Sequence, residues 1–154
     1  MNTCAAKLMG RSRGFTLVEL MVTVVVGAIL VTIAVSTYTN QVRKSRRTEA
    51  KTAVLDLAGR EERNYSTSNA YVAVPASLGY TGGAFPIAVG SGYYNVNVAV
   101  VAAAPGVPAA FTITATPIGA QANDTGCASF TVTDQGVQSA LDSGGADATI
   151  ACWR

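Results

Sequence analysis

The feature that most constrains this chain is an unbroken apolar run near its N-terminus. The 21 residues from Phe15 to Val35 contain a single charged side chain, that of Glu19. As a helix rising about 1.5 Å per residue, this run is about 31 Å long, which matches the hydrocarbon thickness of a bilayer. The sequence therefore predicts one membrane-spanning helix, which leaves the rest of the chain to form a single modest head.

The flanks of the apolar run indicate how it would lie in a membrane. Residues 1–14 carry basic side chains and no acid, so this end is expected to stay cytoplasmic, with the head outside. A secretory signal cut before Thr37 is disfavoured, because signal h-regions typically have about 7 to 15 apolar residues. An ordinary single-span anchor fits the length but leaves Glu19 unexplained, since an unpaired carboxylate in a bilayer costs a few kcal/mol.

The composition excludes several classes of chemistry. The sequence contains no histidine, which removes the commonest general base and the commonest metal ligand. The acids are scattered through predicted turns, and no cysteine is paired with a general base. We therefore expect no catalytic residue, no metal site and no cofactor. After Arg63 the chain has one basic residue, Arg154, and four acids, which argues against a nucleic-acid partner.

Two cysteines near the end of the chain, Cys127 and Cys152, suit an exported head with one disulfide. On the loop-entropy model such a bridge would stabilise the head by roughly 3.5 kcal/mol. The alternative is two buried free thiols. Metal binding by this pair has little support, because two cysteines without histidine cannot complete a tetrahedral site.

The segment from Arg43 to about Tyr65 continues the helix with a different character. Its apolar residues recur at the spacing of one helix face and its other positions are mostly charged. We interpret the basic cluster that opens this stem as a solvated, salt-bridged helix face, rather than a membrane-surface or nucleic-acid patch. The apolar face consists of Ala50, Ala53, Val54, Leu57 and Ala58, and the cluster of Arg43, Lys44, Arg46 and Arg47.

The remainder predicts a small antiparallel sheet. Residues 71–92 have the composition of a loop. Residues 94–101 and 111–116 then alternate as strands joined by a hairpin, and residues 127–133 and 137–140 flank the turn sequence Asp134-Gln135-Gly136. We expect three or four strands packed on the apolar face of the stem helix, which is an α+β fold.

The motif Gly14-Phe15-Thr16-Leu17-Val18-Glu19 resembles the processing site of type IV prepilins. The resemblance implies cleavage between Gly14 and Phe15 by a prepilin peptidase, N-methylation of Phe15, and a role for Glu19 in assembly. The physical chemistry agrees, because Glu19 could pair with the amino terminus of Phe15 on a neighbouring subunit when the helices pack.

Later segments resemble minor pilins of the PilE type, namely Val42–Arg47 with Glu49-Ala50, Leu57-Ala58 with Arg60–Arg63, Tyr65, Asn69 and Tyr71, and the ending Cys152-Trp153. The resemblance implies a subunit that enters or primes a pilus filament serving adhesion or twitching motility. Its partners would be other pilins, through the N-terminal helix, together with the inner membrane and the prepilin peptidase. It would lie in the inner membrane before assembly and in the extracellular pilus afterwards.

These expectations divide the chain into a leader (1–14), a transmembrane or filament-core helix (15–42), an amphipathic stem helix (43–66) and a sheet with a disulfide-bounded end (67–154). A major pilin and a type II secretion pseudopilin are alternatives within the same architecture. A DNA-binding pilin is an alternative from a different functional class.

Overall fold

The computed structural model describes residues 14–154, so the expected leader lies outside the described residues except for Gly14. The chain divides into two compact units between Thr39 and Asn40. One helix, α1 (Leu17–Ser68), belongs to both units. Its end has a clear local cause, because Asn69 adopts a left-handed backbone with φ 57°, and its N–H donates to the Tyr65 carbonyl at 2.8 Å.

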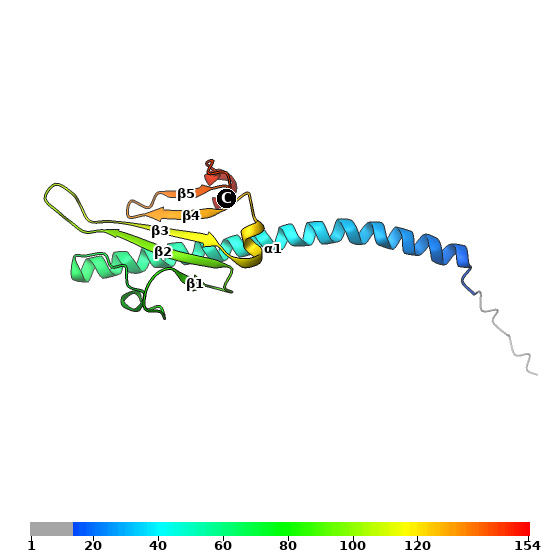
Figure 1. The fold of residues 1–154 in the computed structure, drawn as a ribbon, viewed down its shortest axis with the longest axis horizontal. Helices are drawn as coiled ribbons and strands as arrows, with labels where there is room; N and C mark the ends of the chain where they lie inside the picture. The colour runs from blue at the N-terminus through cyan, green and yellow to red at the C-terminus, as the bar shows by residue number, and fades with distance from the viewer. Residues whose placement is uncertain (1–13) are drawn as a thin grey trace, which may run out of the picture. The chain divides into compact units, whose positions relative to one another are not determined.

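The head contains a five-stranded antiparallel sheet in which each strand pairs with the next one along the chain (Figure 1). Its strands are β1 (Ile87–Val89), β2 (Tyr94–Val101), β3 (Ala110–Pro117), β4 (Ser129–Thr133) and β5 (Gln138–Leu141). Three short helices complete the head: η1 (Pro75–Leu78), η2 (Gly119–Asn123) and α2 (Thr149–Trp153). The predicted α+β arrangement, a long helix packed on a small antiparallel sheet, is confirmed.

The expectation of three or four strands was one or two strands short, because β1 lies inside the segment predicted to be a loop. This strand has only three residues and follows Pro86, so it carries little alternation that a sequence pattern could reveal. Its pairing with β2 places Ile87 opposite Val96. Ile87 and Val89 are buried while Ala88 is exposed, so β1 closes the edge of the core with two side chains.

One layer of core joins the stem to the sheet. Ala50, Val54 and Leu57 on α1 are fully buried, at the helical spacing that the sequence predicted. The facing strands alternate buried and exposed residues, as one-sided sheets do. The buried sheet residues are Tyr94, Val96 and Val98 on β2, Phe111, Ile113 and Ala115 on β3, Phe130 and Val132 on β4, and Ala140 on β5.

Candidate assembly segment and basic hollow

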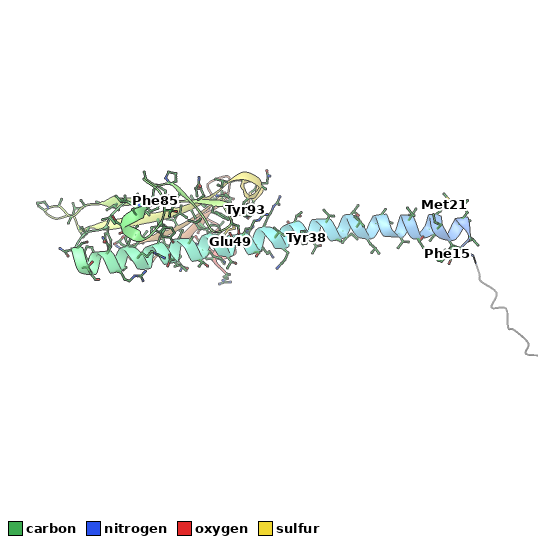
Figure 2. The ribbon with its side chains drawn as sticks, turned by 90° about the horizontal axis from the view of Figure 1, so that it is seen from below. Phe15, Met21, Tyr38, Glu49, Phe85 and Tyr93 are labelled. Atoms are coloured by element: carbon green, nitrogen blue, oxygen red, sulfur yellow. A yellow bond between two sulfur atoms is a disulfide. The ribbon has the colours of Figure 1, made fainter. Side chains whose placement is uncertain are left out.

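The described part of the first unit is mostly the N-terminal half of α1, which is apolar on every side as far as Val35. The large apolar side chains from Phe15 to Val35 are each between 50% and 75% exposed. Figure 2 shows such side chains, Met21 among them, standing out from the helix without neighbours. Among the described residues, α1 is long and apolar enough to cross a membrane, judged by length and composition. A surface of this kind needs lipid or other apolar helices around it.

The predicted processing and assembly residues lie together where this helix begins. The Glu19 N–H donates to the Thr16 hydroxyl at 3.2 Å, so Thr16 caps the helix and Glu19 occupies its first turn. A carboxylate at this end interacts favourably with the helix dipole. Within residues 14–154, the ion pairs are Arg47–Asp124 and Arg60–Asp56. Glu19 is exposed and has no ion-pair partner among those residues, so its charge is available to a group from another molecule.

The second feature is a cavity of about 430 Å³ in the head, which we call the basic hollow. Cationic side chains from the first and the last helix of the head's sequence line it. Lys44, Arg47 and Lys51 come from α1, and Arg154 follows α2. The remaining lining is small or polar, and consists of Gln41, Ser45, Thr48, Ala151 and Cys152.

Arg47 is committed to a partner inside the head. Its guanidinium donates to both Asp124 oxygens, from Nε at 2.7 Å and from Nη2 at 2.6 Å. The Asp124 side chain is 4% exposed, and the buried Gln121 amide also donates to it at 3.0 Å. These hydrogen bonds to Asp124 raise the pKa of Arg47 above its ordinary value. The pair therefore ties α1 to the segment after η2 and provides one fixed wall of the hollow.

Among the described residues the stem acids form only one ion pair within α1, so most of the salt-bridged face that the sequence suggested is missing. Glu49 accepts hydrogen bonds from the backbone and hydroxyl of Ser91, and Glu61 is buried and accepts from the Val72 N–H at 3.1 Å. Asp56 does form an i,i+4 pair with Arg60, and a hydrogen bond from Tyr80 is the main reason that its pKa is lowered. These acids bind outside the helix face because the loops that cover α1 offer them hydrogen-bond donors.

Consequently only some of the cationic side chains in and beside the basic hollow have a partner within the head. Arg47 is paired, and Arg46, which lies outside the lining, stacks over the Tyr93 ring at 3.5 Å. Lys44 and Lys51 have neither a salt bridge nor a side-chain hydrogen bond within the described part of the chain. Exposed Lys44 and half-buried Lys51 therefore leave two uncompensated charges at one rim.

A larger hollow of about 580 Å³ lies along another flank of α1, beside Tyr80 and Val89. Its two carboxylates, Glu49 and Asp56, are those already bonded to Ser91 and to Arg60 and Tyr80. Its charged groups are therefore satisfied internally, unlike those of the basic hollow. Within residues 14–154, no three His, Cys, Asp or Glu side chains come together as a metal site.

The residues before Arg154 are fixed beside the hollow by one disulfide and by two contacts of Trp153. A disulfide joins Cys127 to Cys152 with the Cα atoms 5.9 Å apart. The Trp153 indole N–H donates to the Ser139 carbonyl at 2.9 Å, and its ring packs edge-on against Phe130. The sequence indicated the disulfide but not its consequence, which is that Arg154 is carried to the same cavity as Lys44 and Lys51.

Two known protein families match this chain, over the apolar helix and over the α1 side of the basic hollow but not over Ala151, Cys152 and Arg154. Residues 36–131 match a family model described as type IV minor pilin ComP, DNA uptake sequence receptor. Residues 9–35 match the prokaryotic N-terminal methylation motif. No curated protein matches the chain. The second match spans the Gly14-Phe15 motif, Glu19 and the apolar run, while the first extends from Ser36 through the stem into β4.

Proposed function

The chain belongs to the type IV minor pilin family described by the ComP model, and from this membership we propose how its two features divide the work of a pilus subunit. It is a type IV minor pilin subunit, as the leader motif and stem predicted. Pilins assemble with other pilins after processing of a prepilin. We propose that the apolar half of α1 mediates this assembly and that the head interacts with molecules outside the filament.

The observation that carries the assembly role is an all-apolar helix with one free carboxylate in its first turn. Cleavage between Gly14 and Phe15 would create a cationic amino terminus four residues before Glu19. In apolar surroundings neither charge is tolerated alone, so the amino terminus of one subunit and Glu19 of its neighbour would neutralise each other. N-methylation of Phe15 would keep that amine cationic.

Mass spectrometry of the mature chain tests the processing step. The expected N-terminus is Phe15 carrying one methyl group, and an N-terminus at Met1 or Thr37 would contradict the proposal.

Substitution of Glu19 tests the assembly step. We expect Glu19→Ala to be processed and to accumulate in the membrane with a folded head, yet to be missing from sheared filaments. Thr32→Ala is the matched control, because the Thr32 hydroxyl donates to the Ile29 carbonyl within its own helix. Incorporation of Glu19→Ala at the wild-type level would exclude the docking role.

We further propose that the subunit resides in the inner membrane with its head outside the cytoplasm, and then in the extracellular pilus. The N-terminal methylation motif and the apolar helix support membrane anchoring followed by assembly. The family is one of structural subunits, so the role that we propose requires no catalysis.

A second function, capture of DNA, is favoured by two observations. The family model is described as that of a DNA uptake sequence receptor, and the head carries a hollow with unpaired cations. After Arg63 the acids outnumber the single basic residue, Arg154. The head also includes Lys44 and Lys51, however, which come from α1 and line the same cavity as Arg154. The expectation of no nucleic acid therefore has no support from either the family or the structure.

A further inference from the structure

We propose that the basic hollow binds phosphates of the DNA backbone, with Lys44 and Lys51 as the principal contacts and Arg154 as the third. This inference rests on the second proposed function, the capture of DNA. It assigns to the hollow a contact that positions DNA without reading its sequence.

The spacing of the two lysines favours a polyanion over a small anion. Lys44 and Lys51 are seven residues apart, so they lie on one flank of α1 about 10 Å apart along its axis. One inorganic phosphate would satisfy them poorly at that separation. Double-stranded DNA carries one charge per about 1.7 Å of its axis, so a backbone segment of the same length offers phosphates to both lysines.

The other two cations have distinct roles. Arg47 already places its planar fork on Asp124, so it supports the wall and is not a phosphate contact. Among the described residues Arg154 has no such partner, and the two residues before it are held in place by the Cys152 disulfide and the Trp153 hydrogen bond. Lys44 and Lys51 have no ion-pair partner within residues 14–154, so the two lysines carry the uncompensated charge of the rim.

The rest of the lining indicates which part of DNA is contacted. Gln41, Ser45 and Thr48 offer an amide and two hydroxyls, which suit phosphate oxygens. The hollow contains no aromatic side chain on which a base could stack. We therefore infer contact with the backbone alone. Loss of Lys44 or Lys51 should weaken binding equally for all DNA sequences.

Fluorescence anisotropy on the full chain in non-ionic detergent tests this, with labelled duplexes of about 20 base pairs in two unrelated sequences. At about 50 mM salt, Lys44→Gln and Lys51→Gln should each weaken binding roughly tenfold, and each should lower the slope of log affinity against log salt by about 0.9. Both effects should be equal for the two sequences. Arg63→Gln is the matched control, because exposed Arg63 lies on the same helix outside the hollow, and it should leave affinity unchanged. Trp153 fluorescence verifies that each variant is folded.

Four results would overturn the proposal, and they differ in what they leave standing. Unchanged binding by the doubly substituted Lys44→Gln, Lys51→Gln chain would refute the hollow while DNA capture stands. Absence of DNA binding by the wild type would refute both. A loss confined to one DNA sequence would indicate base readout instead.

The fourth result concerns other sources of phosphate. Fluorescent phosphatidylglycerol and inorganic phosphate serve as probes in the same detergent. We expect inorganic phosphate to displace DNA no better than chloride at equal ionic strength, and the double variant to bind the lipid as the wild type does. Specific displacement by phosphate, or loss of lipid binding with DNA affinity retained, would assign the hollow to those ligands.

Discussion

Replacing Arg47 by glutamine should destabilise the head more than any other single change of a surface charge in the stem. The substitution leaves the Asp124 carboxylate, 4% exposed, with only the Gln121 amide as a side-chain donor. Removing one partner of a buried ion pair typically costs about 3–5 kcal/mol. Because the Arg47 side chain retains 19% exposure, water can partly replace it, and we expect a loss at the lower end, about 3 kcal/mol.

A double-mutant cycle separates this pair from its surroundings. Arg47→Gln with Asp124→Asn removes both charges, so we expect it to cost about 2 kcal/mol less than the two single substitutions combined. Urea unfolding of the full chain in detergent can follow the head alone, since its single tryptophan, Trp153, packs on Phe130 in the core. With a urea m value of about 1.5 kcal/mol/M, the Arg47→Gln midpoint should fall by about 2 M.

The control for this cycle is Arg63→Gln, an exposed change on the same helix that should stay within about 0.5 kcal/mol of wild type. A cost of less than about 1 kcal/mol for Arg47→Gln, the level of an exposed pair, or additivity of the double substitution would refute a strong Arg47–Asp124 interaction.

Two further predictions concern the covalent and titratable parts of the head. Reducing the Cys127–Cys152 bridge should lower the free energy of unfolding by roughly 3.5 kcal/mol, measured by the same urea titration with and without reductant; two free thiols in peptide maps of protein from the periplasm would contradict the bridge. Burial raises the pKa of Glu61, so its folded-state pKa exceeds the unfolded value of about 4.5. Its stabilising contribution is therefore full below pH 4.5 and is lost as pH rises through the folded pKa. Glu61→Gln should flatten this part of the stability curve, Glu62→Gln should not, and a curve that Glu61→Gln leaves unchanged would disprove the assignment.

The elements with strong local patterns could be predicted from the sequence. The apolar run, the Ala50–Val54–Leu57 face and the alternating residues of β2 and β3 each repeat over enough positions to identify their element. β1 could not be predicted in this way, because its three residues become a strand only by pairing with β2. The same holds for α2, which is five residues long and is stabilised by tertiary contacts of Trp153 and Cys152.

The candidate sites likewise divide into one that a local sequence motif reveals and one that depends on tertiary contacts. Gly14, Phe15 and Glu19 are close in sequence, so a motif could reveal them. The basic hollow joins α1 to Arg154, and the Arg47–Asp124 pair joins residues 77 positions apart. Such partners depend on how the sheet packs on the stem, so local charge counting assigned Arg47 to helix acids that bind elsewhere. Contacts of this range follow from topology rather than from local pattern.

The simple strand order of the head also bears on the order in which the head can fold. Each strand from β2 to β5 pairs with the one that precedes it in sequence. The strands of the head can therefore be added in chain order, because each new strand pairs with the edge of the strand that precedes it. Cys127 is the exception, because its partner follows 25 residues later, beyond β4 and β5. Oxidation of this pair is thus expected to be a late step of folding, after β4 and β5 have been added to the sheet.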